Sequence, residues 1–105
     1  MPTPPAQSPL DAPIGTFDVV RVSGILPRRI TKVLTETAGV TRWGTRHFGS
    51  FAVVRKGDTI RLQYRRWPIV DTLQPTCDGV WAGEGAVFGI RFCRFRLHAK
   101  TQTPA

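Results

Sequence analysis

Arginine and aromatic residues alternate in three short segments of this 105-residue chain, at residues 42–48, 61–67 and 91–96. Guanidinium groups neutralise backbone phosphates and aromatic rings stack on unpaired bases, so this combination is typical of proteins that bind single-stranded nucleic acid. The side chains expected at such an interface are Arg42, Trp43, Arg65, Arg66 and Trp67. The same alternation also arises when aromatic residues fill a core and arginines line the solvated face. The sequence favours this simpler interpretation.

Groups able to carry out acid–base or metal chemistry are scattered along the chain. Two histidines and seven carboxylates show no Ser-His-Asp or nucleophile-elbow spacing. Cys77 and Cys93 lack a spacing typical of zinc ligands, and no glycine pattern matches a nucleotide-binding loop. We expect Glu84 to be a surface charge or to pair with a nearby arginine, and Asp71 to cap or turn the segment after Pro68. No catalytic residue, metal or cofactor is expected, so a binding role is favoured over an enzymatic one.

The chain is strongly basic. It carries 15 Lys plus Arg against 7 Asp plus Glu, which gives a formal net charge of +8. Such a positive field favours anionic partners, including nucleic acid, acidic lipid and phosphorylated ligands. An acidic protein that meets the arginine-bearing face is a third possible partner, which the sequence does not distinguish from nucleic acid.

Cysteine content, the N-terminal sequence and the length of the apolar runs bear on the cellular location of the protein. Two cysteines are too few for a disulfide scaffold, and the N-terminus lacks the basic start and apolar stretch of a secretory signal. We therefore expect a cytoplasmic location, where a Cys77–Cys93 bridge is geometrically possible but disfavoured. The longest aliphatic or aromatic run covers four residues, Phe51 to Val54, so no membrane span is expected.

The length and composition fit one globular domain, with 41% hydrophobic and 21% charged residues. Residues 1–13 contain five of the nine prolines and no Lys or Arg, so we expect a disordered tail there. Residues 99–105 are expected to be disordered as well. The folded, β-rich domain should therefore span residues 14–98.

The first half of this domain predicts a strand followed by a short helix. Residues 16–22 are rich in Val and Phe and end at Ser23 and Gly24, which indicates a strand. Over residues 27–38, Ile30, Val33 and Leu34 fall at helical spacing, between Pro27 and a C-terminal stop at Gly39. We expect one short helix there.

The clearest local signal is a β-hairpin over residues 51–64, with Gly57 and Asp58 as a two-residue turn. If Lys56 faces Thr59, the strands place Val53 opposite Leu62 and Phe51 opposite Tyr64 on one apolar face. The other face, with Arg61 and Gln63, is mostly polar and should point to water.

The C-terminal segment predicts two further strands, over residues 80–87 and 88–97. Phe88, Ile90 and Phe92 occupy even positions, whereas Cys93, Phe95 and Leu97 occupy odd ones. One regular strand cannot bury both sets, so we expect a β-bulge near Phe92. The predicted order is a strand, a helix, then four or five antiparallel strands. The fold class is mainly β, either a small antiparallel barrel or a strongly curved sheet. We favour the barrel, because a closed sheet has no exposed edge strands.

Two stretches resemble a known group of proteins. Gly15, Thr16 and Phe17 are similar to the Gly-x-Trp start of lipocalins and fatty-acid-binding proteins, with Phe in place of Trp. The stretch from Leu62 to Leu97 resembles lipocalin-like domains, including the one in bacterial proteins with the GXWXG motif, which the segment Trp43 to Phe48 also echoes. The resemblance implies a calycin-type barrel that holds an apolar ligand, and it implies no catalytic residues.

From the apolar face and this resemblance we predict a non-enzymatic barrel that binds a hydrophobic or amphipathic small molecule. The alternative is the single-stranded nucleic-acid binder described above, and a filled core without a cavity is an equally simple outcome. Arg94 and Arg96 are expected to meet a ligand carboxylate at the cavity mouth, or else to lie exposed. The expected ligand-binding residues are Phe51, Val53, Leu62, Tyr64, Trp81, Phe88, Phe92, Arg94 and Arg96.

Overall fold

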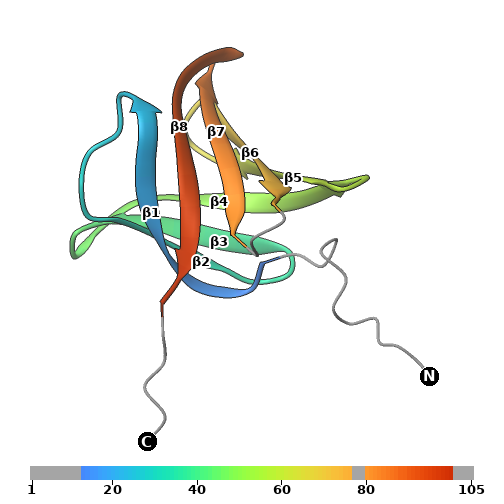
Figure 1. Cartoon of the computed structure of the whole chain (residues 1–105), viewed down its shortest axis with the longest axis horizontal. Coiled ribbons are helices and arrows are strands. Elements are labelled where there is room, and N and C mark those ends of the chain that lie inside the picture. Colours follow the sequence, from blue (N-terminus) through green and yellow to red (C-terminus); the bar gives the residue numbers. More distant parts are fainter. Residues whose placement is uncertain (1–12, 77–79, 101–105) are drawn as a thin grey trace, which may run out of the picture.

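The computed structural model describes residues 13–76 and 80–100, which form a closed barrel of eight antiparallel strands (Figure 1). Each strand pairs with the next along the chain, and β8 returns to pair with β1. The expected barrel is therefore confirmed, with more strands than predicted. The strands are β1 (Gly15–Gly24), β2 (Ile30–Leu34), β3 (Ala38–Trp43), β4 (Arg46–Lys56), β5 (Thr59–Tyr64), β6 (Ile69–Pro75), β7 (Trp81–Val87) and β8 (Ile90–Ala99).

The central hairpin of β4 and β5 has the register that the sequence predicts. Val53 pairs with Leu62 and Phe51 pairs with Tyr64. The turn begins at Gly57, whose φ of 64° lies in the left-handed region that glycine adopts without strain. Phe51 and Leu62 are fully buried, so this face of the hairpin points into the barrel.

The predicted irregularity near Phe92 is also present. Gly85 pairs with Cys93 and Ala86 pairs with Arg91, so Phe92 has no partner on β7. The extra residue changes the side that faces inward, and Cys93, Phe95 and Leu97 are consequently buried. A second register shift, between Arg21 and Ser23 of β1, lets β1 follow the bent β8 to its end.

The predicted helix over residues 27–38 is wrong. Its centre forms β2, in which Ile30, Lys32 and Leu34 are buried while Thr31 and Val33 are only partly covered. This is the two-residue period of a strand, and Val33 and Thr31 are β-branched residues that favour one. The helical spacing was misleading because it counted Val33 as the core residue and left out Lys32. The part of the chain that the structure describes contains no helix.

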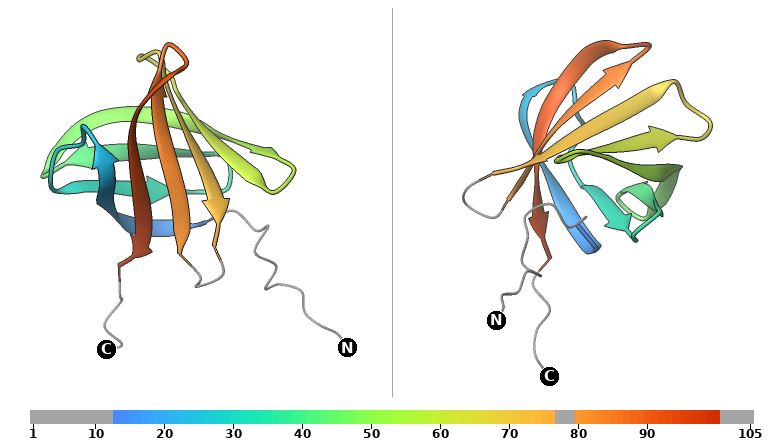
Figure 2. Two further views of the ribbon diagram at one scale, coloured as in Figure 1. Left: turned by 45° about the horizontal axis from the view of Figure 1, so that its top comes forward. Right: turned by 90° about the vertical axis from the view of Figure 1, so that its right-hand side faces the viewer.

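Because neighbouring strands run antiparallel, their connections alternate between the two ends of the barrel. Residues 25–29, 44–45, 65–68 and 88–89 connect strands at one end, which we call the mouth end. Figure 2 (left) shows the β5–β6 and β7–β8 connections at the top and the β1–β2 and β3–β4 connections at the left. The opposite end, with residues 35–37 and 57–58, is called the closed end.

The closed end holds the apolar core. Leu34, Ile60, Leu62, Leu73 and Leu97 come from four strands and are at most 1% exposed. Burying each such side chain stabilises the fold by about 1.5–3 kcal/mol relative to leaving it in water. The barrel is thus plugged at this end, and any internal space must lie nearer the mouth.

The expected terminal segments, 1–13 and 99–105, lie largely outside the described residues. Ala99 belongs to β8, and the backbone N–H of Lys100 donates to the carbonyl of Thr16 at 2.9 Å. The described residues contain no helix that is long and apolar enough to cross a membrane.

Candidate functional site

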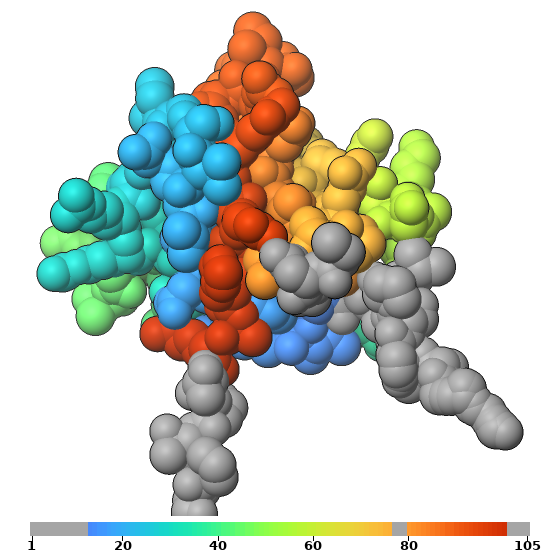
Figure 3. All heavy atoms as spheres, in the orientation of Figure 1, coloured from blue at the N-terminus to red at the C-terminus, as the bar shows by residue number. Residues whose placement is uncertain are grey.

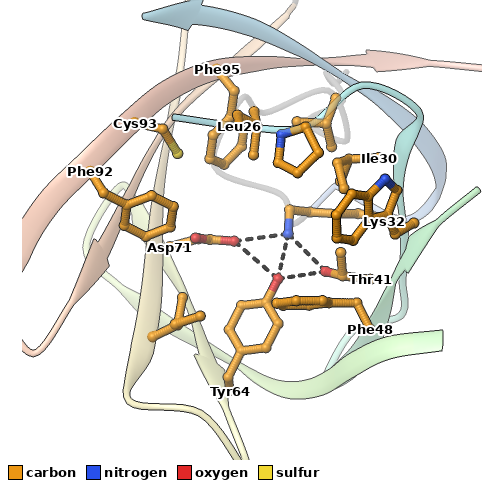
Figure 4. Close-up of a pocket in the computed structure, with 14 residues that line it drawn as sticks. Leu26, Ile30, Lys32, Thr41, Phe48, Tyr64, Asp71, Phe92, Cys93 and Phe95 are labelled. Atoms are coloured by element: carbon orange, nitrogen blue, oxygen red, sulfur yellow. Dashed lines mark hydrogen bonds and ion pairs between the residues drawn. The ribbon is translucent and has the colours of Figure 1, made fainter. Parts of the chain in front are cut away.

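A cavity of about 140 Å³ lies inside the mouth end of the barrel, partly open to solvent (Figure 4). Its walls come from strands far apart in the sequence and from the β1–β2 connection. Most of its lining is apolar, and includes Leu26, Ile30, Trp43, Phe48, Ile69 and Phe92. The polar side chains that line it are Lys32, Thr41, Tyr64 and Asp71, which we call the polar cluster.

Lys32 is the centre of the polar cluster. Its ammonium Nζ lies 2.8 Å from Asp71 Oδ2, and the two side chains are only 4% and 6% exposed. The same nitrogen donates to Thr41 Oγ1 at 2.8 Å and to Tyr64 OH at 2.6 Å. All three ammonium hydrogens therefore have a partner, as a buried charge requires.

The hydroxyls close the hydrogen-bonded ring that Figure 4 shows. Thr41 and Tyr64 share a hydrogen bond, and the Tyr64 hydroxyl donates to Asp71 Oδ2 over a long 3.4 Å. If Thr41 donates to Tyr64 and Tyr64 donates to Asp71, every donor in the cluster is used. The Tyr64–Asp71 bond is the weakest of the set, because hydrogen bonds weaken beyond about 3.2 Å.

Aromatic rings surround the charge. Lys32 Nζ lies 5.5 Å from the ring centre of Phe51, 5.2 Å from that of Tyr64 and 5.8 Å from that of Phe95. At these distances the negative face of a ring attracts a cation. The rings therefore offset part of the cost of removing the ammonium group from water.

The strand register explains why these four side chains meet. Lys32 lies between Ile30 and Leu34 on the inward face of β2, and Asp71 lies between Ile69 and Leu73 on that of β6. Leu62 pairs with Asp71, so Tyr64, two residues further along β5, lies beside the carboxylate.

The protonation of the cluster follows from its geometry. Burial lowers the pKa of Lys32, but the attraction of the Asp71 carboxylate and the hydrogen bonds to Asp71 and Tyr64 outweigh it, so the pKa lies above its usual 10.5. Burial, together with the Asp71 charge, raises the pKa of Tyr64 above 10.0. At neutral pH Lys32 is therefore charged and Tyr64 is a neutral phenol, which can donate a hydrogen bond but is not a nucleophile.

Cys93 also lines the cavity and is buried with a free thiol. Burial, followed by the nearby Asp71 charge, raises its pKa. The thiol is therefore protonated at neutral pH and has little nucleophilic character. Cys77, the other half of the bridge considered above, lies outside the described residues.

The structure divides the expected ligand-binding residues among three environments. Tyr64 and Phe92 line the cavity. Phe51 and Leu62 are fully buried in the core, and Val53 and Trp81 are partly buried against it. The remaining three residues, Phe88, Arg94 and Arg96, do not line the cavity.

Phe88 lies in the β7–β8 turn, 80% exposed, because the tight turn with Gly89 takes it out of the strand alternation. Arg94 and Arg96 alternate with the buried Cys93, Phe95 and Leu97, so the bulge at Phe92 turns them to the outside of the barrel. There they line a groove on the outside of the barrel. Of the two positions expected for Arg94 and Arg96, the one at the cavity mouth is therefore wrong, and the one outside the cavity is what the structure shows.

The five residues expected to bind nucleic acid gather at the mouth end. Arg42, Trp43, Arg65, Arg66 and Trp67 are all exposed. Trp67 is nevertheless packed on one side, because its ring stacks on Phe48 at 5.6 Å and its Nε1–H donates to the Phe48 carbonyl at 3.2 Å. Trp43 contributes to the cavity wall as well as to the surface.

Glu84 forms the ion pair that the sequence suggested as one alternative. Its Oε2 lies 3.5 Å from Arg91 Nη1 and 3.4 Å from Arg94 Nε, with all three side chains about half exposed. Pairs as exposed as these contribute little to stability. In the described chain no three His, Cys, Asp or Glu side chains lie close enough to hold a metal ion.

Sequence reasoning missed three members of the polar cluster, Lys32, Thr41 and Asp71. Asp71 was expected to cap or turn the chain, yet it is buried within β6. The alternation of inward-facing residues along a strand could have placed two of them in the interior. Lys32 and Asp71 each have an apolar residue two positions before and two positions after them.

The resemblance to lipocalin-like domains rests on short motifs and stays a prediction. Gly15 begins β1, and the stretch from Leu62 to Leu97 supplies most of β5 to β8. Comparison with protein-family models, curated proteins and solved structures finds no match for this chain.

Proposed function

We propose that this barrel binds a compact, largely apolar small molecule that carries one uncharged polar group, and that it does so without catalysing a reaction. The observation that carries the proposal is the cavity itself, which lies in an otherwise plugged barrel and has the polar cluster in its wall. Concave, mostly apolar sites with a few convergent polar groups are typical of small-molecule binding.

The cavity volume limits the ligand. An engineered cavity of about 150 Å³ in another protein holds benzene, and the cavity here is about 140 Å³. A single-ring compound therefore fits, whereas a long acyl chain would extend through the mouth.

The polar cluster limits the chemistry of the ligand. Lys32 and Asp71 neutralise each other, and Lys32 already donates all three hydrogens. An incoming carboxylate would have no free cation, so an uncharged hydroxyl is the better match. A ligand hydroxyl that accepts from Tyr64 and donates to Asp71 would replace their long 3.4 Å bond with two of normal length.

Calorimetric titration with toluene and para-cresol tests this proposal, because the two differ by one hydroxyl. We expect both to bind with one-to-one stoichiometry, and para-cresol to bind about three- to tenfold more tightly, as expected for one net hydrogen bond. Tyr64→Phe should remove this preference while leaving toluene binding intact.

A blocking variant and a matched control complete the design. Leu26→Trp adds bulk to the cavity wall from a connection rather than a strand, and should abolish binding of both compounds. Val54→Trp adds the same ring on the outer surface of β4 and should change neither affinity. If neither compound saturates the protein, or if Leu26→Trp binds as well as the unmodified chain, the proposal is wrong.

A further inference from the structure

The mouth end carries the most exposed large apolar side chains of the described residues. Phe88 is 80% exposed, Ile25 is 78% exposed and Ile90 is 71% exposed. Phe88 and Ile90 belong to the β7–β8 hairpin, whose tip stands out from the body of the barrel (Figures 1 and 3). Ile25 follows the end of β1, and its N–H donates to the Phe92 carbonyl on the adjoining β8. Trp43 and Trp67, each about half exposed, belong to the same end.

The charge at this end has one sign. The four segments that form it, residues 24–30, 42–48, 64–69 and 86–92, contain no Asp or Glu. Within the part of the chain that the structure describes, Arg91 alone among their arginines forms an ion pair, with Glu84 further down β7. The carboxylates Glu36 and Asp58 lie in connections at the closed end. The arginines of the mouth end are Arg28, Arg29, Arg42, Arg46, Arg65, Arg66 and Arg91.

The backbone adds a second observation. Arg29 and Phe88 are the non-glycine residues with positive φ in the described chain, at 64° and 51°, and both are exposed at the mouth end. A bulky residue in this conformation is strained. Phe88 gains no compensating burial within the barrel, so its place at the tip is unexplained by folding alone.

We propose that the mouth end docks on the surface of an anionic lipid bilayer. Apolar tips would enter the boundary between headgroups and acyl chains, while the surrounding arginines would meet anionic headgroups. Exposed tryptophans are common at this depth because the indole ring has both apolar and polar edges.

A bilayer explains this surface better than single-stranded nucleic acid does. Ile25 and Ile90 have no aromatic face to stack on bases, and one side of the Trp67 ring is occupied by Phe48. Acyl chains, in contrast, form an apolar environment that stabilises any apolar side chain at the tip. Docking in this orientation turns the cavity toward the bilayer. Docking does not require an occupied cavity, so bilayer binding and ligand binding can each be absent without the other.

Sedimentation with lipid vesicles tests the inference on the full chain. We expect the protein to bind vesicles of equal parts phosphatidylcholine and phosphatidylserine, and to bind weakly to phosphatidylcholine alone. Binding should shift tryptophan emission to shorter wavelength, because two of the three tryptophans are at the mouth end.

Two matched pairs of variants locate the docking surface. Arg65→Gln with Arg66→Gln should weaken binding by about fivefold for each arginine. Arg55→Gln with Arg61→Gln changes the net charge equally, but on the β4–β5 hairpin away from the mouth, and should have a much smaller effect.

Phe88→Asn should weaken vesicle binding by roughly tenfold or more, whereas Ile14→Asn, exposed at the closed end, should not. Asn tolerates the left-handed conformation, so Phe88→Asn should fold at least as well as the parent.

Four results would overturn the proposal. The first is no binding to the anionic vesicles, and the second is an equal loss in the two arginine pairs. The third is binding of a single-stranded oligonucleotide through Arg65 and Arg66 while vesicles are ignored. The fourth is a dimer in light scattering that Phe88→Asn dissociates, without vesicle binding, which would assign the exposed tips to a second copy of the chain.

Discussion

The ammonium group of Lys32 is hidden inside the barrel, and its energetics differ from those of a surface ion pair. Removing two charges from water costs several kcal/mol each, which their attraction offsets only when both partners are present and fully hydrogen-bonded. The Lys32–Asp71 pair meets that condition through Thr41 and Tyr64. Loss of one partner should therefore cost more than loss of both.

Lys32→Met leaves the Asp71 carboxylate buried without a cation, and we expect it to lower the free energy of unfolding by about 3–5 kcal/mol. Adding Asp71→Asn to the same chain removes the stranded charge and should recover a large part of this loss. Urea denaturation of the parent, both single variants and the double variant measures the coupling. If the double variant loses as much free energy of unfolding as the two single variants together, Lys32 and Asp71 do not depend on each other.

The protonation of the cluster predicts lower stability at alkaline pH. The pKa values of Lys32 and Tyr64 are raised above 10.5 and 10.0 in the folded chain. Below pH 10 both groups hold their protons folded and unfolded, so this stability is fully present. Above it the unfolded chain loses protons first, and stability should fall by up to about 1.4 kcal/mol per pH unit for each such proton.

Tyr64→Phe removes one of these protons and should make the alkaline loss less steep. Denaturation at several pH values above neutrality measures the slope in both proteins. The chain contains one tyrosine, so phenolate absorbance follows Tyr64 directly. A folded-state titration below pH 10 would contradict the predicted direction.

At the scale of the strands, glycine lets aromatic rings fill a narrow barrel. A Cβ at Gly83 on β7 would overlap the ring of Phe95, and a Cβ at Gly39 on β3 would overlap the ring of Phe51. Both rings are buried. The small residues on β3 and β7 thus make room for rings that come from β4 and β8.

Gly83→Ala should therefore destabilise the barrel by about 1–3 kcal/mol through overpacking. Its backbone φ is not positive, so the cost is steric rather than conformational. Adding Phe95→Leu should relieve the overlap, and thermal unfolding measures both. Gly44→Asn is the control, because Gly44 faces open space in a left-handed conformation that Asn tolerates. If Gly83→Ala unfolds at the same temperature as the parent, the rings do not fill this space as described.

The elements differ in how far the sequence could predict them. The β4–β5 hairpin was predicted to the residue because its turn and its alternation are both local signals. The bulge at Phe92 was also predicted, since the phase of the apolar residues changes there. The segment Ile30–Leu34 was not, because a buried lysine breaks the apolar alternation that identifies a strand.

At the scale of the molecule, closure and charge distribution define two unlike ends. Pairing of β1 with β8 leaves no open edge in the barrel, and leucines plug the closed end. The mouth end combines a cavity, exposed apolar tips and arginines. The ligand-binding and bilayer-docking proposals both rest on the mouth end, while the plugged closed end explains why the cavity opens there and not at both ends.

The sequence by itself determined the β-rich class, the central hairpin register and the bulge, because these depend on residues a few positions apart. Only the tertiary structure decided that Lys32, Thr41, Tyr64 and Asp71 share one cluster. They lie on four different strands, and their meeting depends on how β2, β3, β5 and β6 curve around the same interior. Local alternation says that a side chain points inward, but closure of the sheet decides which inward side chains meet.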